Sequence, residues 1–212
     1  KINNYKFLYL DLSIRENVEK KFDIILNNIK NLEYFINCSY ITDRNYSKSN
    51  FKEIEYDNFV NNLNYNLFTY TWTAKLVLDY FKKYKKGSVV LLNSIYGILG
   101  QDLSLYKNTN MKENFTYSVA KGGITNAIRQ FASYYGKYNI RVNSICSGGI
   151  EGHIKSSKQK QSKNFISNYS AKCPLGRLAK PAEISNVIKF LCSEESSYIT
   201  GTNLIVDGGW SA

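Results

Sequence analysis

The sequence is poor in residues that mark several classes of protein. It has two prolines, one histidine, one methionine and four cysteines in 212 residues, and its first glycine is Gly87. A single histidine excludes metal centres built on several histidines. We interpret the cysteines as reduced thiols, because their wide spacing excludes a C-x-x-C zinc or redox motif; they are Cys38, Cys146, Cys173 and Cys192.

Long apolar runs are also missing. No stretch approaches the roughly 20 apolar residues that span a bilayer, and the lysine-rich opening of the chain does not resemble a signal peptide. We therefore expect a single domain over residues 1–212, located in the cytoplasm and without a membrane partner.

Positive charge is the strongest global feature of the sequence. The formal net charge is +11 and the pI is about 9.3, and clustered lysine and arginine would favour binding to nucleic-acid phosphates. Here the lysines are scattered without a basic arm, and asparagine, isoleucine and tyrosine are abundant as well. We attribute the charge to a general compositional bias and expect no nucleic-acid partner.

Apolar runs alternate with amphipathic stretches, a pattern typical of a parallel sheet covered by helices. The run Val89–Leu92 fits a strand buried on both faces. The sequence thus predicts a doubly wound α/β fold. The expected strands are Lys6–Leu10, Tyr34–Asn37, Ser88–Asn93, Arg141–Ile145 and Asn203–Val206. The expected helices are Arg15–Asn28, Tyr56–Lys83, Tyr117–Tyr135 and Pro181–Leu191.

One polar segment interrupts this pattern. Lys155–Asn168 is rich in lysine and serine, so we expect a mobile loop or short helices there. Disorder and a lid over a substrate are both open, and we favour the lid. His153, just before this segment, is interpreted as a loop residue.

Tyr117 and Lys121 are four residues apart, which places a phenol and an ammonium on one face of a helix. A fixed cation beside a tyrosine favours the phenolate, so the pair could act as a general acid and base. An ordinary surface pair on a helix would give the same spacing. A third polar residue, Ser94, ends a predicted buried strand, where open α/β sheets hold their ligands.

Together with further motifs in the same order, these residues resemble the short-chain dehydrogenase/reductase family over essentially all 212 residues. The motifs that carry the resemblance are Asp11-Leu12, Asn37-Cys38-Ser39-Tyr40, Asn66, Ser94, Tyr117 with Lys121, Arg141–Ile145, Ser147–Ile150, Pro174–Arg177, Tyr198–Gly201 and Val206–Gly209.

The resemblance implies a Rossmann-like doubly wound parallel sheet, NAD or NADP as cofactor, and a homodimer or homotetramer. It assigns the substrate oxygen to Ser94, proton transfer to Tyr117, the lowering of the Tyr117 pKa to Lys121, and a proton-relay water to Asn66. The positions that it implies for cofactor binding are Asp11, Leu12, Asn37, Cys38, Ser39, Tyr117, Lys121, Ser147, Gly148 and Ile150.

The sequence departs from the family pattern at its start. The family's first two strands and glycine-rich phosphate-binding turn are absent. We expect that Lys1 is not the biological start, because without those strands the edge of Tyr34–Asn37 would be exposed. Two smaller departures concern cofactor geometry: Tyr40 stands where the family has glycine, and Ser147 where it has proline.

The interval between Ser94 and Tyr117 is about ten residues longer than is usual in the family, and its extra residues, Gln101–Met111, are mostly polar. Three features together resemble a bacterial subgroup of the family: this insert, the Ser-Ile-Tyr-Gly motif that begins at Ser94, and the Gly-Gly-Trp-Ser-Ala end of the chain. That subgroup is associated with surface-glycan and nonulosonic-acid pathways, including flagellin modification. We expect a polar small-molecule substrate: an amino-sugar, sugar-phosphate or nucleotide-sugar alcohol. Two alternatives stay open, a 3-oxoacyl thioester reductase and a non-catalytic scaffold.

Overall fold

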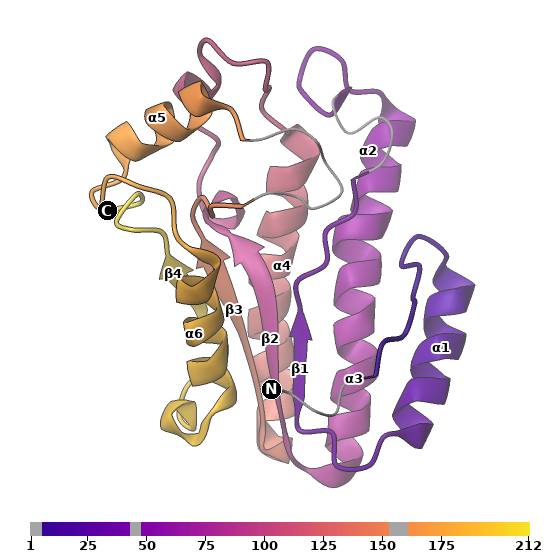
Figure 1. Ribbon diagram of the computed structural model, residues 1–212. Helices are drawn as coiled ribbons and strands as arrows, with labels where there is room; N and C mark the ends of the chain where they lie inside the picture. Colours follow the sequence, from indigo (N-terminus) through magenta and orange to yellow (C-terminus); the bar gives the residue numbers. More distant parts are fainter. Residues whose placement is uncertain (1–5, 43–47, 153–160) are drawn as a thin grey trace.

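The computed structural model describes residues 6–42, 48–152 and 161–212 of the chain (Figure 1). Within these ranges one parallel sheet has the strand order β1-β2-β3-β4. The strands are β1 (Tyr34–Asn37), β2 (Gly87–Ser94), β3 (Ile140–Ser147) and β4 (Asn203–Val206). The two central strands pair along their full length, so that Ser94 and Ser147 lie side by side at their carboxyl ends.

Helices connect the strands and cover both faces of the sheet. The α-helices are α1 (Arg15–Asn28), α2 (Tyr56–Leu63), α3 (Tyr70–Tyr84), α4 (Phe115–Tyr135), α5 (Lys163–Lys172) and α6 (Pro181–Cys192). A π-helix, η2 (Asn64–Thr69), joins α2 to α3. The 3-10 helices are η3 (Ile95–Gly97), η4 (Leu103–Tyr106), η5 (Gly136–Tyr138) and η6 (Glu194–Ser196).

The side chains of β2 explain the two layers of helices. Val89 and Leu91 point into a core formed with α1, α3 and α4, whereas Val90 packs with residues of α6. Helix α6 lies on the face of the sheet opposite to α3 and α4 (Figure 1). Because successive strand residues alternate between faces, a strand covered on both sides needs an unbroken apolar run. The predicted doubly wound α/β fold is therefore confirmed.

One predicted strand is wrong. Residues 6–10 form no strand, and Phe7 and Tyr9 are mostly exposed. A strand needs a neighbour to satisfy its backbone groups, and residues 6–10 pair with none of the described strands, since the edge strand β1 pairs with β2 alone. Tyr34 and Ile36 of β1 are each 46% exposed, as expected for an edge without a partner.

Other predicted elements agree with the structure, with two refinements. The predicted helix Tyr56–Lys83 is interrupted by the π-helix η2. Part of the polar segment forms α5, whose N-terminus is capped by the Ser162 hydroxyl accepting from the Phe165 N–H. His153 and residues 155–160 lie outside the described residues. No helix in the described ranges has the length and apolar character needed to cross a membrane.

Candidate active site

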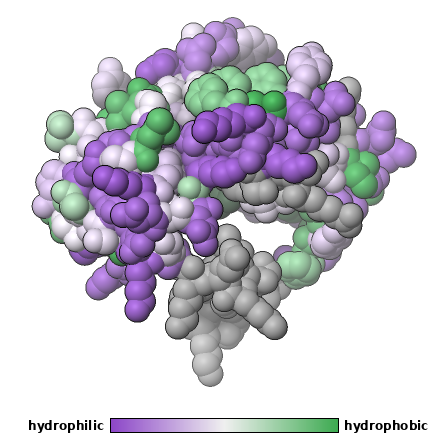
Figure 2. All heavy atoms as spheres, turned by 90° about the horizontal axis from the view of Figure 1, so that it is seen from above, coloured by the Kyte–Doolittle hydropathy of each residue, from purple (hydrophilic) through white to green (hydrophobic). Residues whose placement is uncertain are grey.

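The predicted catalytic residues gather at the carboxyl ends of β2 and β3, the upper end of the molecule in Figure 1. Ser94 ends β2 and caps η3, and its hydroxyl accepts a hydrogen bond from the Tyr96 N–H at 3.2 Å. Seen from above, this end of the molecule combines hydrophilic surface with smaller hydrophobic patches (Figure 2).

The first turns of α4 carry Tyr117 and Lys121. The helix begins where the Asn114 side chain accepts a hydrogen bond from the Tyr117 N–H at 2.9 Å, which satisfies one of the free donors of a helix N-terminus. Gly97 brings the turn after Ser94 against this helix, because a Cβ there would lie 2.7 Å from the Lys121 carbonyl oxygen and 2.6 Å from the Thr125 hydroxyl. Only glycine permits this approach.

Lys121 is buried, with 5% of its surface exposed. Its ammonium donates to the Leu92 carbonyl oxygen at 3.0 Å and lies over the rings of Tyr40, Tyr70 and Tyr117 at 5.7, 5.5 and 5.5 Å from their centroids. Burial disfavours the charged form and lowers the pKa of Lys121 to about 8. The predicted pair therefore joins a buried Lys121 to a half-buried Tyr117 and is not an ordinary surface pair.

Tyr70 joins this group to the end of β1. Its hydroxyl lies 2.7 Å from the Asn37 carbonyl oxygen and 3.0 Å from that of Leu92, and burial raises its pKa. The Asn37 side chain accepts from the N–H and the hydroxyl of Ser39 at 2.9 and 2.7 Å. The first residues after β1 are therefore held in place, while Cys38 between them is exposed.

Asn66 lies on the π-helix η2 and is buried. Its amide clamps one residue of the loop after β1, accepting from the Ile41 N–H at 2.8 Å and donating to the Ile41 carbonyl oxygen at 3.0 Å. π-helical turns occur frequently at functional sites. The structure gives the Asn66 side chain a positioning contact, and its proton-relay role stays a prediction.

The other residues predicted to bind a cofactor fall into two groups. Ser147 ends β3 beside Ser94, and Gly148 and Ile150 follow it; a Cβ on Gly148 would meet the Tyr169 hydroxyl at 2.5 Å. Asp11 and Leu12 make their contacts elsewhere. The carboxylate of Asp11 accepts from Ser13, which lowers its pKa, and Leu12 packs on the core.

The donor set at Lys121 fits the nicotinamide half of a dinucleotide. An ammonium has three N–H donors, and the described residues give that of Lys121 one hydrogen-bond acceptor, Leu92. Its remaining donors suit ribose hydroxyls. The residues here that could hold the cofactor are Lys121, Tyr117, Asn37 and the turn Ser147–Ile150.

Aromatic side chains form the other side of Tyr117. The ring of Tyr96 lies 6.3 Å from that of Tyr117 and 6.3 Å from that of Trp210, both edge-on. Trp210 in turn stacks on Tyr169 of α5 at 5.9 Å. A row of rings therefore extends from Tyr117 to α5.

The insert Gln101–Met111, which we call the cap, packs against α5. Leu105 is fully buried among α5 residues, and the Asn168 amide donates to the Leu105 and Lys107 carbonyl oxygens at 3.1 and 3.0 Å. Gln101 fastens the insert to α4: it donates to the Asn114 carbonyl oxygen at 2.6 Å and the Ser118 hydroxyl at 2.8 Å. The insert thus links α5 to the helix that carries Tyr117.

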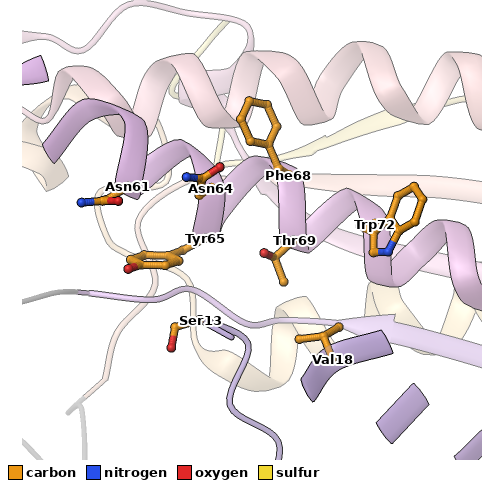
Figure 3. A pocket seen from close by; sticks show the side chains of 8 residues that line it. All are labelled: Ser13, Val18, Asn61, Asn64, Tyr65, Phe68, Thr69 and Trp72. Atoms are coloured by element: carbon orange, nitrogen blue, oxygen red, sulfur yellow. The ribbon is translucent and has the colours of Figure 1, made fainter. Parts of the chain in front are cut away.

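A cavity of about 600 Å³ lies away from this group, between α1 and the outer side of α2, η2 and α3 (Figure 3). It contains none of the predicted catalytic residues, and no charged side chain lines it, so we do not assign the chemistry to it. Its lining residues are Ser13, Val18, Asn61, Asn64, Tyr65, Phe68, Thr69 and Trp72.

Three residues of the site were not predicted from the sequence: Tyr70, Tyr96 and Trp210. A signal existed for Tyr70, because it follows Asn66 by four residues and so shares its helix face. Tyr96 and Trp210 meet through contacts between distant parts of the chain, for which the sequence offers no pattern.

The fold and the site define a Rossmann-like enzyme with a tyrosine–lysine pair at the ends of its strands. The family model described as Enoyl-(Acyl carrier protein) reductase matches residues 1–211. The chain belongs to the short-chain dehydrogenase/reductase family, which confirms the predicted family and its reaction class, NAD(P)-dependent oxidoreduction.

Individual relatives agree with this assignment. The Post-translational flagellin modification protein A of Campylobacter coli is 30% identical over 96% of this chain and 77% of its own. The 3-oxoacyl-[acyl-carrier-protein] reductase FabG of Thermotoga maritima is 28% identical over 94% and 74%. A short chain dehydrogenase of Leptospira borgpetersenii, solved with bound NAD+, is 29% identical with a TM-score of 0.85, covering 99% of this chain and 77% of that one.

Proposed function

We propose that this protein interconverts an alcohol and a carbonyl on an amino-sugar, sugar-phosphate or nucleotide-sugar in bacterial surface-glycan biosynthesis. The observation that carries the chemistry is the buried Lys121 ammonium, 5.5 Å from the centre of the Tyr117 ring. A cation held there stabilises the phenolate and allows Tyr117 to exchange a proton near neutral pH.

The residues of the site divide the reaction among them. Ser94 holds and polarises the substrate oxygen, and Tyr117 gives a proton to that oxygen or takes one from it. Lys121 favours the phenolate, and Asn66 holds the loop after β1 in position. NAD or NADP, when bound, supplies or accepts the hydride, so the protein contributes position and electrostatics.

The polar insert and one relative support a carbohydrate substrate. The side chain of Gln101 joins the insert to the helix of Tyr117 by donating to the Ser118 hydroxyl, and its Oε1 accepts a hydrogen bond from the Tyr106 hydroxyl at 2.7 Å. The Campylobacter coli relative is described as a flagellin modification protein. A pocket with polar groups suits a hydroxylated substrate better than an acyl chain.

A 3-oxoacyl thioester reductase is the competing function, favoured by the similarity to the Thermotoga maritima reductase. The first test is a fluorescence titration of NADH and NADPH into the full-length protein. Turnover of nucleotide-sugars, sugar phosphates and an acetoacetyl thioester follows, with Tyr117→Phe as the blank. Turnover of the thioester alone would replace the sugar assignment, and no cofactor binding would indicate a scaffold.

We also infer a homodimer or homotetramer. Large apolar side chains lie exposed on α2, η2, α3 and α4, including Tyr56, Phe68, Trp72 and Tyr134, and such residues are enriched in interfaces. Light scattering with size-exclusion chromatography measures the assembly directly, and a monomer at all concentrations would contradict the inference.

A further inference from the structure

Of the three rings around Lys121, that of Tyr40 comes from a loop. Tyr70 and Tyr117 are fixed by α3 and α4, whereas Tyr40 belongs to the segment after β1. Its ring meets that of Tyr117 edge-on at 5.2 Å and lies 5.7 Å from the Lys121 ammonium. Tyr40 therefore contacts both members of the acid–base pair.

We propose that Tyr40 is a positioning residue of the site: its ring completes a three-sided cage that holds the Lys121 ammonium on the Leu92 carbonyl and supports the Tyr117 ring from the side. This inference rests on the proposed function, because it concerns the same site. It adds a residue to which no catalytic role was assigned and states how that residue acts.

The clamp on the neighbouring residue supports this role. Asn66 bonds both backbone groups of Ile41, at 2.8 and 3.0 Å, and thus fixes the peptide that follows Tyr40. On the other side, Ser39 is bonded to the Asn37 side chain. Tyr40 is consequently placed between two anchored residues, as a side chain with a defined position requires.

The cage also stabilises the positive charge of the buried Lys121 ammonium. Burial of Lys121 disfavours its charge, and the titratable groups that face it in the described part of the chain are Cys38, Cys146 and the three tyrosines, none of them a carboxylate. Aromatic faces attract a cation, most strongly where water is excluded. The rings therefore stabilise the ammonium where no counter-ion does so.

The test measures the pKa of Lys121 without turnover. Protein labelled with ¹³C at lysine Cε is titrated by NMR, and the signal is assigned from its loss in Lys121→Arg. Tyr40→Leu should lower the pKa of Lys121 by about one unit, because a desolvated cation–π contact is lost. Tyr40→Phe should keep the wild-type value, because it keeps the ring.

Controls separate this proposal from a loss of fold and from the proposed function. Tyr65→Leu removes a tyrosine that lines the cavity on the outer side of η2 (Figure 3) and should leave the pKa of Lys121 unchanged. Amide spectra establish that each variant is folded. An unchanged pKa in Tyr40→Leu, or an equal fall in Tyr40→Phe, would overturn the cage, even in a protein with full activity. Absent cofactor binding would overturn the proposed function and leave the NMR result standing.

Discussion

Tyr117 lies between two regions that are built differently. Toward β1 and α3, buried polar groups are bonded to backbone carbonyls, as Tyr70 and Lys121 are to Leu92. Toward α5, the contacts are between aromatic rings, and the insert is held by the side chain of Gln101. The first region is held mainly by hydrogen bonds to the backbone, including those that fix the loop after β1, whereas the second is held mainly by contacts between side chains.

We expect this structural difference to correspond to a functional one, with proton transfer depending on one side of Tyr117 and substrate specificity on the other. Changes on the side of Lys121 should act on proton transfer, since that side sets the charge beside the phenol. Changes on the side of the insert should act on substrate binding, because the insert and α5 pack with Tyr96 on the side of Tyr117 away from Lys121. Kinetic constants can therefore test the division.

The largest effect is expected for Tyr117→Phe. Loss of the hydroxyl removes the proton donor and should lower kcat by about 10²–10⁴-fold, a larger effect than that on cofactor affinity, because Lys121 and the other residues expected to hold the cofactor remain. Steady-state kinetics and NADH fluorescence measure the two quantities. Tyr96→Phe is the matched control in the neighbouring ring and should keep most of the activity. Equal losses in both variants would contradict the assignment of the proton to Tyr117.

Activity should also fall as the pH rises through about 8, the pKa to which burial lowers Lys121. The charged ammonium supports the phenolate, so its deprotonation should reduce kcat/KM about tenfold per pH unit above that value. A profile that stays flat to pH 10 would exclude Lys121 as the cation that the reaction requires.

The same titration affects stability with a defined sign. Between about pH 8 and the ordinary lysine value of 10.5, the unfolded chain holds the Lys121 proton more tightly than the folded one. The contribution of this residue to the free energy of unfolding therefore rises with pH across that interval. Denaturant titrations of wild type and Lys121→Met should show the rise only in the wild type.

A smaller effect is expected where the two regions meet. Gly97→Ala would place a Cβ within 3.0 Å of α4 backbone, and the resulting shift should lower the free energy of unfolding by about 1–3 kcal/mol. It should also lower kcat, because Ser94 and Lys121 move apart. Gly100→Ala, where a Cβ meets nothing within 4 Å, is the control; equal destabilisation by both would contradict the close approach.

The residues of the site also differ in how far the sequence predicts them. Helix spacing and the end of an apolar strand, both local patterns, make Tyr117, Lys121 and Ser94 candidates, and the resemblance to the family supplies their predicted roles. The cage of Tyr40 and the row of Tyr96 and Trp210 arise from contacts between distant segments. Local patterns carry no information on such contacts, so only the structure reveals them.

The strand predicted at Lys6–Leu10 failed for a related reason. Its short run of consecutive apolar residues satisfies the local pattern of a buried strand, but a strand is stable only beside another strand. Within the described residues β1 has no neighbour on that side, and residues 6–10 remain without regular structure. The sequence pattern therefore indicates that the segment can form a strand, but none of the described strands pairs with it.

The smallest effect is expected in the insert. Gln101→Ala removes the hydrogen bonds to Asn114 and Ser118 and should loosen the cap, raising KM about tenfold while kcat changes little. The reason is that each partly buried hydrogen bond contributes about 1 kcal/mol, and the helix of Tyr117 keeps its other contacts. Measurement of KM and kcat on the substrate found in the screen checks both values.

Lys172→Gln is the matched variant, because it breaks another tether of the insert, the ion pair with Asp102. Both side chains of this ion pair are partly exposed, and exposed pairs contribute little. KM should therefore change less than twofold, and any salt dependence of KM that arises from this pair should disappear. A larger effect of Lys172→Gln than of Gln101→Ala would show that the cap is held through α5 and not through α4. A fall in kcat with unchanged KM in Gln101→Ala would show that the insert acts on Tyr117 itself, and the division between the two sides of the site would then fail.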